Sequence, residues 1–313
     1  ARKLETIAIK YFRPGDYAES LTYFKKAIAQ YPFDAAIYLE MGSTYVQLKQ
    51  YPQAIEAFKQ AIKIEPDNTL AIGVLAGVYT LQGRFEDALV MDEKIIEIKP
   101  DSQTYRNIGY LLKDMGRNEE AVEAFKNAIK TNPKDSHAQA YIDLGSVYFK
   151  LNLVDDAIKA FEKAKEIDPN CAFTYNNLGI AYGNLGRHQE AIEACKQAIR
   201  INPDYADAYC NLGTAYDSFG RYQDAVEACK QAIIIKPDYA EAHVGLGNAY
   251  GNLGRYEEAI DCYKQAIRIK PDYAEAHNNL GFTYGKLGRH QEAVESYKQA
   301  IRIKPDLAEA HCN

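Results

Sequence analysis

The chain has 313 residues, of which 47% are hydrophobic, so it is long enough to bury a sizeable core. Its net charge is −6, and acidic and basic residues are mixed along its whole length, so no basic stripe is available to neutralise phosphates. The sequence therefore argues against nucleic acid and anionic membrane surfaces as partners. No run of about 18 apolar residues occurs, so we expect no insertion into a membrane.

Nine prolines divide the chain at nearly constant intervals of 33 to 36 residues. They are Pro32, Pro66, Pro100, Pro133, Pro169, Pro203, Pro237, Pro271 and Pro305. A period in this range indicates stacked supersecondary units, each of which buries its apolar face only against its neighbours. Function is then expected on an extended surface made by many repeats, and not in a pocket made by one.

Residues 240–273 show the pattern of one unit. Each half has apolar or aromatic residues three and four positions apart, as one face of a helix requires. Gly254 separates the two halves, and Pro271 ends the second helix because it lacks an N–H. We predict that Asp272 caps the next helix and that Glu275 completes a capping box. The same capping pattern recurs at Asp204, Asp238 and Asp306.

In chain order, these helical hairpins fall into four groups. Residues 1–101 hold repeats 1 to 3, and residues 102–171 hold repeats 4 and 5 with irregular turns. Residues 172–307 hold repeats 6 to 9, which are nearly identical, and residues 308–313 begin a truncated tenth repeat. Repeat 3 departs from the pattern, because it has Asp92 for the aromatic residue, Ala76 for the glycine and Ile95 for the alanine.

Two irregularities affect how the array is built. The proline interval shortens before Pro133 and lengthens before Pro169, so we expect a change of curvature around residues 101–138; a tolerated change of loop length is the alternative. The tenth unit stops at Asn313 without a polar capping helix. This indicates either a chain that continues or an end that pairs with another copy in a homo-oligomer.

The repeated residues resemble the tetratricopeptide repeat family. Repeat 6 supplies the family pattern at Tyr175, Leu178, Gly179, Tyr182, Ala191, Cys195, Ala198 and Pro203, with cysteine in place of the second aromatic residue. The resemblance covers essentially the whole chain as nine full repeats. It implies an all-α fold, a solenoid of helical hairpins that winds into a right-handed superhelix. The first helix of each hairpin would line its inner groove.

In hairpins of this family, the sixth residue of the first helix faces the groove. Along the array this residue is Thr6, Glu40, Val74, Asn107, Asp143, Asn177, Asn211, Gly245, Asn279 and Asn313. An asparagine amide both donates and accepts, so a ladder of asparagines can hold an extended peptide by its backbone. The pattern is similar to the ladders of O-linked N-acetylglucosamine transferase and kinesin light chain.

Neighbouring groove positions add five asparagines to the predicted peptide-binding set. They are Asn176, Asn184, Asn248, Asn252 and Asn278. Gly245 interrupts the ladder, and inheritance of a repeat consensus is the competing explanation for the asparagines. The N-terminal groove is predicted to be apolar instead, through Ile9, Leu39, Val46, Leu70, Val74 and Leu81. Such a surface suits an amphipathic helix or hydrophobic peptide, although packing against an adjacent helix explains several of these residues equally well.

The cysteine and histidine patterns do not indicate chemistry. The six cysteines have no C-x-x-C spacing, and Cys195 and Cys229 occupy a core position, so we predict buried, reduced thiols. His243 and His277 recur at the core aromatic position and are predicted to be core residues. No catalytic motif occurs outside the repeat pattern. We therefore expect no catalytic residue, no metal and no cofactor, and a reducing, cytoplasmic setting.

The sequence favours a non-enzymatic scaffold that binds an extended peptide or protein segment in its concave groove. Two alternatives remain open. The chain could be the substrate-recruiting region of a larger enzyme, such as a glycosyltransferase or a protease. It could also be a scaffold that assembles into oligomers.

Overall fold

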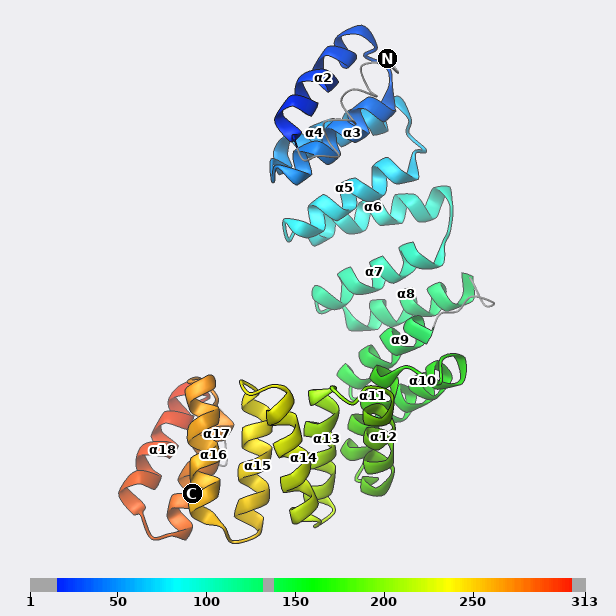
Figure 1. The fold of residues 1–313 in the computed structure, drawn as a ribbon. Helices are drawn as coiled ribbons and strands as arrows, with labels where there is room; N and C mark the ends of the chain where they lie inside the picture. Colours follow the sequence, from blue (N-terminus) through cyan, green and yellow to red (C-terminus); the bar gives the residue numbers. More distant parts are fainter. Residues whose placement is uncertain (1–15, 132–137, 306–313) are drawn as a thin grey trace. The chain divides into compact units, whose positions relative to one another are not determined.

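The computed structural model describes residues 16–131 and 138–305, and all regular secondary structure within these ranges is α-helical (Figure 1). The described residues form seventeen successive helices of 13 or 14 residues. The chain divides into two compact units, Ala1–Leu151 (unit 1) and Asn152–Asn313 (unit 2). The predicted all-α array of helical hairpins is confirmed.

Unit 1 contains the second helix of repeat 1, the hairpins of repeats 2 to 4 and the first helix of repeat 5. These are α2 (Tyr17–Gln30), α3 (Ala35–Gln47), α4 (Tyr51–Ile64), α5 (Thr69–Leu81), α6 (Phe85–Ile98), α7 (Ser102–Asp114), α8 (Asn118–Thr131) and α9 (Ala138–Lys150). The two helices of each hairpin pack together, and the second helix of one hairpin contacts the first helix of the next.

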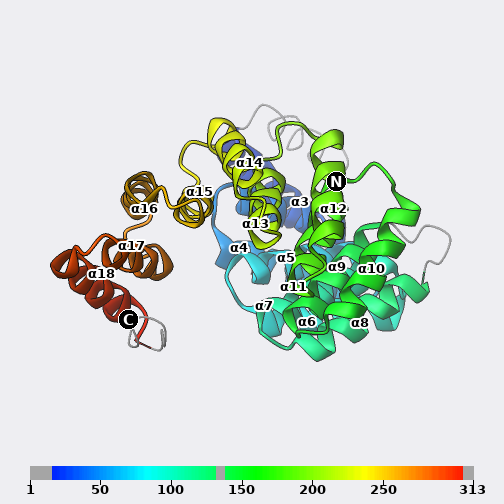
Figure 2. The ribbon, with the colours of Figure 1, turned by 90° about the horizontal axis from the view of Figure 1, so that it is seen from below.

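Unit 2 contains the second helix of repeat 5 and the hairpins of repeats 6 to 9 (Figure 1 and Figure 2). These are α10 (Val154–Ile167), α11 (Ala172–Asn184), α12 (His188–Ile201), α13 (Ala206–Ser218), α14 (Tyr222–Ile235), α15 (Ala240–Asn252), α16 (Tyr256–Ile269), α17 (Ala274–Lys286) and α18 (His290–Ile303). The first helices of successive repeats in unit 2 also contact one another, so together they line one continuous inner face.

In several hairpins a glycine of the first helix faces an aromatic ring of the second helix. A Cβ atom built on Gly109 would lie 2.6 Å from Cε1 of Phe125, and one on Gly247 would lie 2.6 Å from Cε1 of Tyr263. Both rings are buried. Only glycine leaves room for these rings, so the Leu-Gly pair and the second-helix aromatic residue of the repeat pattern have one shared packing role.

Two repeats place cysteine where the ring would be. Cys195 and Cys229 lie opposite Gly179 and Gly213, and both are buried free thiols, as the sequence predicted. Burial raises the pKa of Cys195 to about 12, because a thiolate is poorly solvated in this position. These cysteines are therefore inert core residues.

The turn between the two helices of a hairpin also follows the prediction. Gly254 ends α15 with a φ of +75°, in the left-handed region that favours glycine. The predicted caps of the first helices in unit 2 are wrong by one residue. The N-cap of α17 is Tyr273 and not Asp272, and no side chain caps this helix.

The same correction applies to Asp204 and Asp238, because Tyr205 and Tyr239 are the N-caps of α13 and α15; Asp306 lies outside the described residues. At the N-cap position the tyrosine side chain packs against its neighbours, whereas an aspartate would accept a hydrogen bond from the first turn of the helix. Tyr273 packs against the hydrophobic core, and the ammonium group of Lys270 lies 4.8 Å from its ring centroid. In unit 1, where Asp34, Asn68 and Asp101 directly precede their helices, the side chains do cap.

The histidines at the core aromatic position are half-buried and stabilise the turn between repeats. In repeat 9, Nε2 of His277 lies 3.1 Å from the carbonyl oxygen of Pro271, to which it donates. His243 makes the equivalent contact with Pro237 at 3.2 Å. No group of three potential metal-ligating side chains converges within the described ranges.

In repeat 3, two departures from the pattern offset each other in size. Ala76 places a methyl group where the other first helices have glycine, and α6 presents the shorter Asp92 in place of a ring. Asp92 is only 4% exposed, and no other described residue forms a hydrogen bond or ion pair with it. Burial raises the pKa of Asp92 from 3.8 to about 7, and the nearby negative charge of Asp101 adds to this effect.

We predict that Gly247→Ala destabilises the protein and that Gly251→Ala in the same helix stabilises it. The first change forces a methyl group into the buried ring of Tyr263 and costs about 1–3 kcal/mol of unfolding free energy. The second meets nothing closer than the Tyr263 hydroxyl at 4.0 Å, so it gains roughly 0.5–1 kcal/mol of helix propensity. Urea unfolding of both variants checks the pair, and equal effects would contradict the packing argument.

We also predict that Asp92→Asn stabilises the protein more at about pH 8 than at about pH 5. The folded-state pKa of Asp92 is raised, so its contribution to stability is fully present below the unfolded-state pKa and is lost as the pH rises towards 7. Asparagine removes this loss, and the difference between the two pH values is on the order of 2 kcal/mol. Urea unfolding at both pH values measures it, and a pH-independent effect would show that the carboxyl group is not desolvated.

Candidate functional site

The predicted asparagines of unit 2 lie on the inner face formed by α11, α13, α15 and α17. Asn177, Asn211, Asn248 and Asn279 are half-buried, Asn184 and Asn252 are exposed, and Asn176 and Asn278 are buried. The set therefore does not form a uniform row of solvent-facing amides. Of its buried members, Asn176 accepts a hydrogen bond from the next first helix, and Asn278 donates to Asn279 of its own helix.

Several of these amides bond to one another across repeats. Nδ2 of Asn211 donates to Oδ1 of Asn176 at 2.9 Å, and Nδ2 of Asn279 donates to Oδ1 of Asn248 at 3.0 Å. In the same way, Nδ2 of Asn252 donates to Oδ1 of Asp217 at 2.9 Å. These bonds tie each first helix to the next, so part of the hydrogen-bonding capacity predicted for a ligand is used within the protein.

A cavity of about 520 Å³ opens on this face between α13, α15 and α17. Three of the predicted asparagines line it: Asn248, Asn252 and Asn279. The remaining predicted asparagines of unit 2 lie outside its lining. The cavity thus contains one residue of the ladder, Asn279, with the neighbouring Asn248 and Asn252 of repeat 8. The structure leaves Asn176, Asn177, Asn184, Asn211 and Asn278 elsewhere on or below the inner face.

The cavity also contains residues that the sequence reasoning missed, namely Asp217, Phe282 and Lys286. Phe282 is 48% exposed, and the ammonium group of Lys286 lies 4.9 Å from its ring centroid. All three stand at groove positions where the other hairpins of unit 2 have other residues. Departure from the repeat consensus, and not its recurrence, is the sequence signal that marks them.

Hydrogen bonds within the protein hold the polar groups of this cavity in place. The Tyr263 hydroxyl donates to Oδ1 of Asn248 at 2.8 Å, and burial raises the pKa of this tyrosine well above its usual value. Burial also raises the pKa of Asp217, while the hydrogen bond from Asn252 opposes that shift. The site therefore combines oriented amides, one carboxyl group, one ammonium group and an exposed ring, which can contact both the backbone and the side chains of a peptide.

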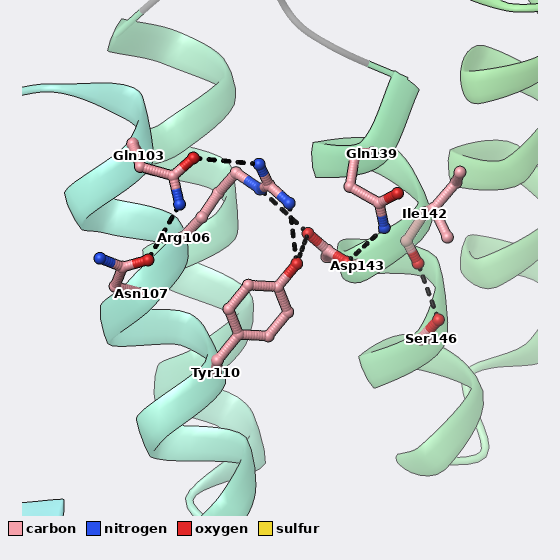
Figure 3. A network of polar contacts seen from close by, with 8 residues as sticks. All are labelled: Gln103, Arg106, Asn107, Tyr110, Gln139, Ile142, Asp143 and Ser146. Carbon is pink, nitrogen blue, oxygen red and sulfur yellow. Dashed lines mark hydrogen bonds and ion pairs between the residues drawn. The ribbon is translucent and has the colours of Figure 1, made fainter. Parts of the chain in front are cut away.

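The groove positions of unit 1 behave differently. Figure 3 shows that Asp143 on α9 receives hydrogen bonds from three side chains: Nε of Arg106 at 3.1 Å, the Tyr110 hydroxyl at 2.6 Å and Nε2 of Gln139 at 2.9 Å. Asp143 is 8% exposed. The predicted Asn107 is exposed beside this network and accepts from Gln103 at 2.9 Å. Here the groove side chains bind α7 to α9.

Only some residues of the predicted apolar N-terminal groove are exposed enough to contact a ligand. Leu39, Val46 and Val74 are half-buried, and Leu39 packs against a cluster of alanines from α3, α4 and α5. Leu70 and Leu81 are 65% and 66% exposed. Packing thus accounts for Leu39, while the other two leucines face solvent; Ile9 lies outside the described residues.

No helix in the described ranges is both long enough and apolar enough to cross a bilayer.

Three family models match the sequence. The model described as "Cilia and flagella-associated protein 70 C-terminal domain" matches residues 90–312, and two models described as "Tetratricopeptide repeat" match residues 46–108 and 6–69. The chain therefore belongs to the tetratricopeptide-repeat proteins, in the domain family that the first of these models describes. The resemblance to the tetratricopeptide repeat family seen in the sequence is confirmed.

Several solved structures are similar to this chain. A chain of the APC/C hetero-tetramer Cut9–Hcn1 is similar over 85% of this chain, with a TM-score of 0.60 and 17% identity, and the match spans 52% of that chain. TTC0263, a thermophilic tetratricopeptide-repeat protein of Thermus thermophilus, matches 56% of this chain and 95% of its own, with a TM-score of 0.51 and 26% identity. MamA is 32% identical over 54% of this chain and 99% of its own, with a TM-score of 0.46. No curated protein matches the chain.

We predict that Asp143→Ala lowers the free energy of unfolding by about 3–5 kcal/mol, because it leaves Arg106 unpaired with its side chain only 14% exposed. Glu123→Ala is the control in the same unit. It breaks the pair with Lys126, whose members are 68% and 47% exposed, and changes stability by less than about 1 kcal/mol. Urea unfolding followed by circular dichroism measures both, and similar losses would contradict a special role for the network.

Proposed function

We propose that the chain is a non-enzymatic scaffold that binds an extended peptide or protein segment on the inner face of unit 2. The cavity between α13, α15 and α17 is the observation that carries this proposal. A repeat array with this inner face is suited to protein–protein interaction, since successive first helices present their side chains at regular spacing.

The chemistry of the cavity supports an extended segment over a small polar ligand. Amide groups of Asn248, Asn252 and Asn279 can pair with the donors and acceptors of a peptide backbone. The half-exposed ring of Phe282 offers an apolar contact of the kind that anchors binding interfaces. One carboxyl group and one ammonium group, from Asp217 and Lys286, can orient the segment.

The setting that we propose is the cytoplasm. The five cysteines within the described ranges are free thiols, which suits a reducing compartment.

The proposal predicts that Phe282→Ala weakens peptide binding at least about tenfold, the loss typical of an anchoring side chain. Peptides would be selected from a displayed random library on the immobilised full chain and then measured by fluorescence anisotropy. Because Phe282 is half-exposed, its removal leaves the core intact, which circular dichroism would verify.

Ile234→Ala is the matched control, because Ile234 is an apolar residue of α14 that is 69% exposed and lies outside the cavity. Its affinity for the selected peptides should equal that of the unmodified chain. Peptides that bind both variants equally well, or a library that yields no binder, would refute the proposed site.

A further inference from the structure

A second pocket lies on the inner face of unit 1, next to a residue by which repeat 3 departs from the pattern. A cavity of about 310 Å³ lies between the first helices α5 and α7, and the one residue of α6 that lines it is Asp92. In the other hairpins of unit 1 the second helix has an aromatic ring at the equivalent position, as Phe58 in repeat 2. Asp92 therefore puts a carboxyl group in the lining of the cavity where the other hairpins have a ring.

That carboxyl group has no partner. Asp92 is 4% exposed, lines the cavity, and forms no hydrogen bond or ion pair within the described ranges. A buried carboxylate without a partner is costly, and this cost raises the pKa of Asp92 to about 7. A cation that entered the cavity would supply the missing partner.

The pocket is open to such a group. Gly77 on α5 faces empty space, since a Cβ atom built there would meet nothing within 4 Å. The walls include the ring of Tyr110 and the exposed Leu81, which can contact the methylene stem of a long side chain. None of the residues that line the cavity is basic.

The surrounding charges leave Asp92 without a cation. The sequence of α5 contains no charged residue, and α7 brings Asp114 to the rim. The two cations of α7 are engaged elsewhere, because Arg106 pairs with Asp143 and the ammonium group of Lys113 lies 5.3 Å from the Tyr110 ring centroid.

The N-cap of α7 adds a further negative charge. Asp101 accepts hydrogen bonds from the backbone and hydroxyl groups of Thr104 and lies close enough to Asp92 to disfavour its ionisation. The base of the pocket is therefore a site of negative potential.

We propose that this pocket binds the cationic head group of a lysine or arginine side chain from a bound polypeptide segment, with the carboxylate of Asp92 as its ion-pair partner. The position on the inner face, next to Asn107 and Leu81, lets the backbone of such a segment continue along the groove. This site is separate from the cavity of unit 2, so neither proposal depends on the other.

The test uses the full chain with ¹³C-labelled alanine, leucine and threonine methyl groups, so that Ala76, Thr80 and Leu111 report on the pocket. The probes are the peptide acetyl-Gly-Lys-Gly-amide, its norleucine analogue and butylamine. At about pH 8 we expect saturable shifts of these methyl signals with the lysine peptide and at least about tenfold weaker binding of the analogue. Binding should weaken by a similar factor at about pH 5.5, where Asp92 takes up a proton.

Asp92→Asn should lose the response, and Asp87→Asn should keep it. Asp87 lies on the same helix, half-exposed in a pair with Arg84, so the two variants have the same change of charge. Equal binding by both variants, equal binding of the lysine and norleucine peptides, or no saturable shift would overturn the proposal. Butylamine that binds as tightly as the lysine peptide would show that the pocket takes a free amine, and would overturn the assignment to a polypeptide side chain.

Discussion

The contact between a glycine of the first helix and a side chain of the second helix, made in repeats 2, 4 and 6 to 9, is the constraint on which the rest of the structure depends. It sets how closely the two helices of a hairpin approach, as at Gly109 with Phe125 and at Gly247 with Tyr263. A hairpin of this thickness can stack on the next one, and in unit 2 the first helices then meet along one inner face. Each unit has one cavity that is lined mainly by residues of its first helices.

The two cavities differ in whether this contact is present beside them. In repeat 8 the contact is intact, and the hydroxyl of the packed Tyr263 supports Asn248 at the base of the unit 2 cavity. In repeat 3 the contact is replaced by Ala76 and Asp92, and both residues line the pocket. A core position can therefore shape the binding surface in either way, by supporting a polar group or by supplying one.

The sequence alone was sufficient for the helices, the hairpin turns and the buried faces, because each of these depends on residues close together in one repeat. It was insufficient for interactions between repeats. The bonds Asn211–Asn176 and Arg106–Asp143 join side chains 35 and 37 residues apart, and no periodic pattern distinguishes them from free groove positions. The predictions of the capping residues were wrong for a related reason. Tyr273 packs against the core, and a local capping rule does not consider such packing.

The reach of these interactions has a consequence for how the chain folds. The longest-range side-chain bond among the described residues spans 37 residues, a little more than one repeat. Forming any one contact therefore requires closing only a short loop, and the entropic cost of loop closure stays small however many repeats are added. Such a chain can acquire its structure hairpin by hairpin from many starting points, and it can open at one end while the remainder stays folded.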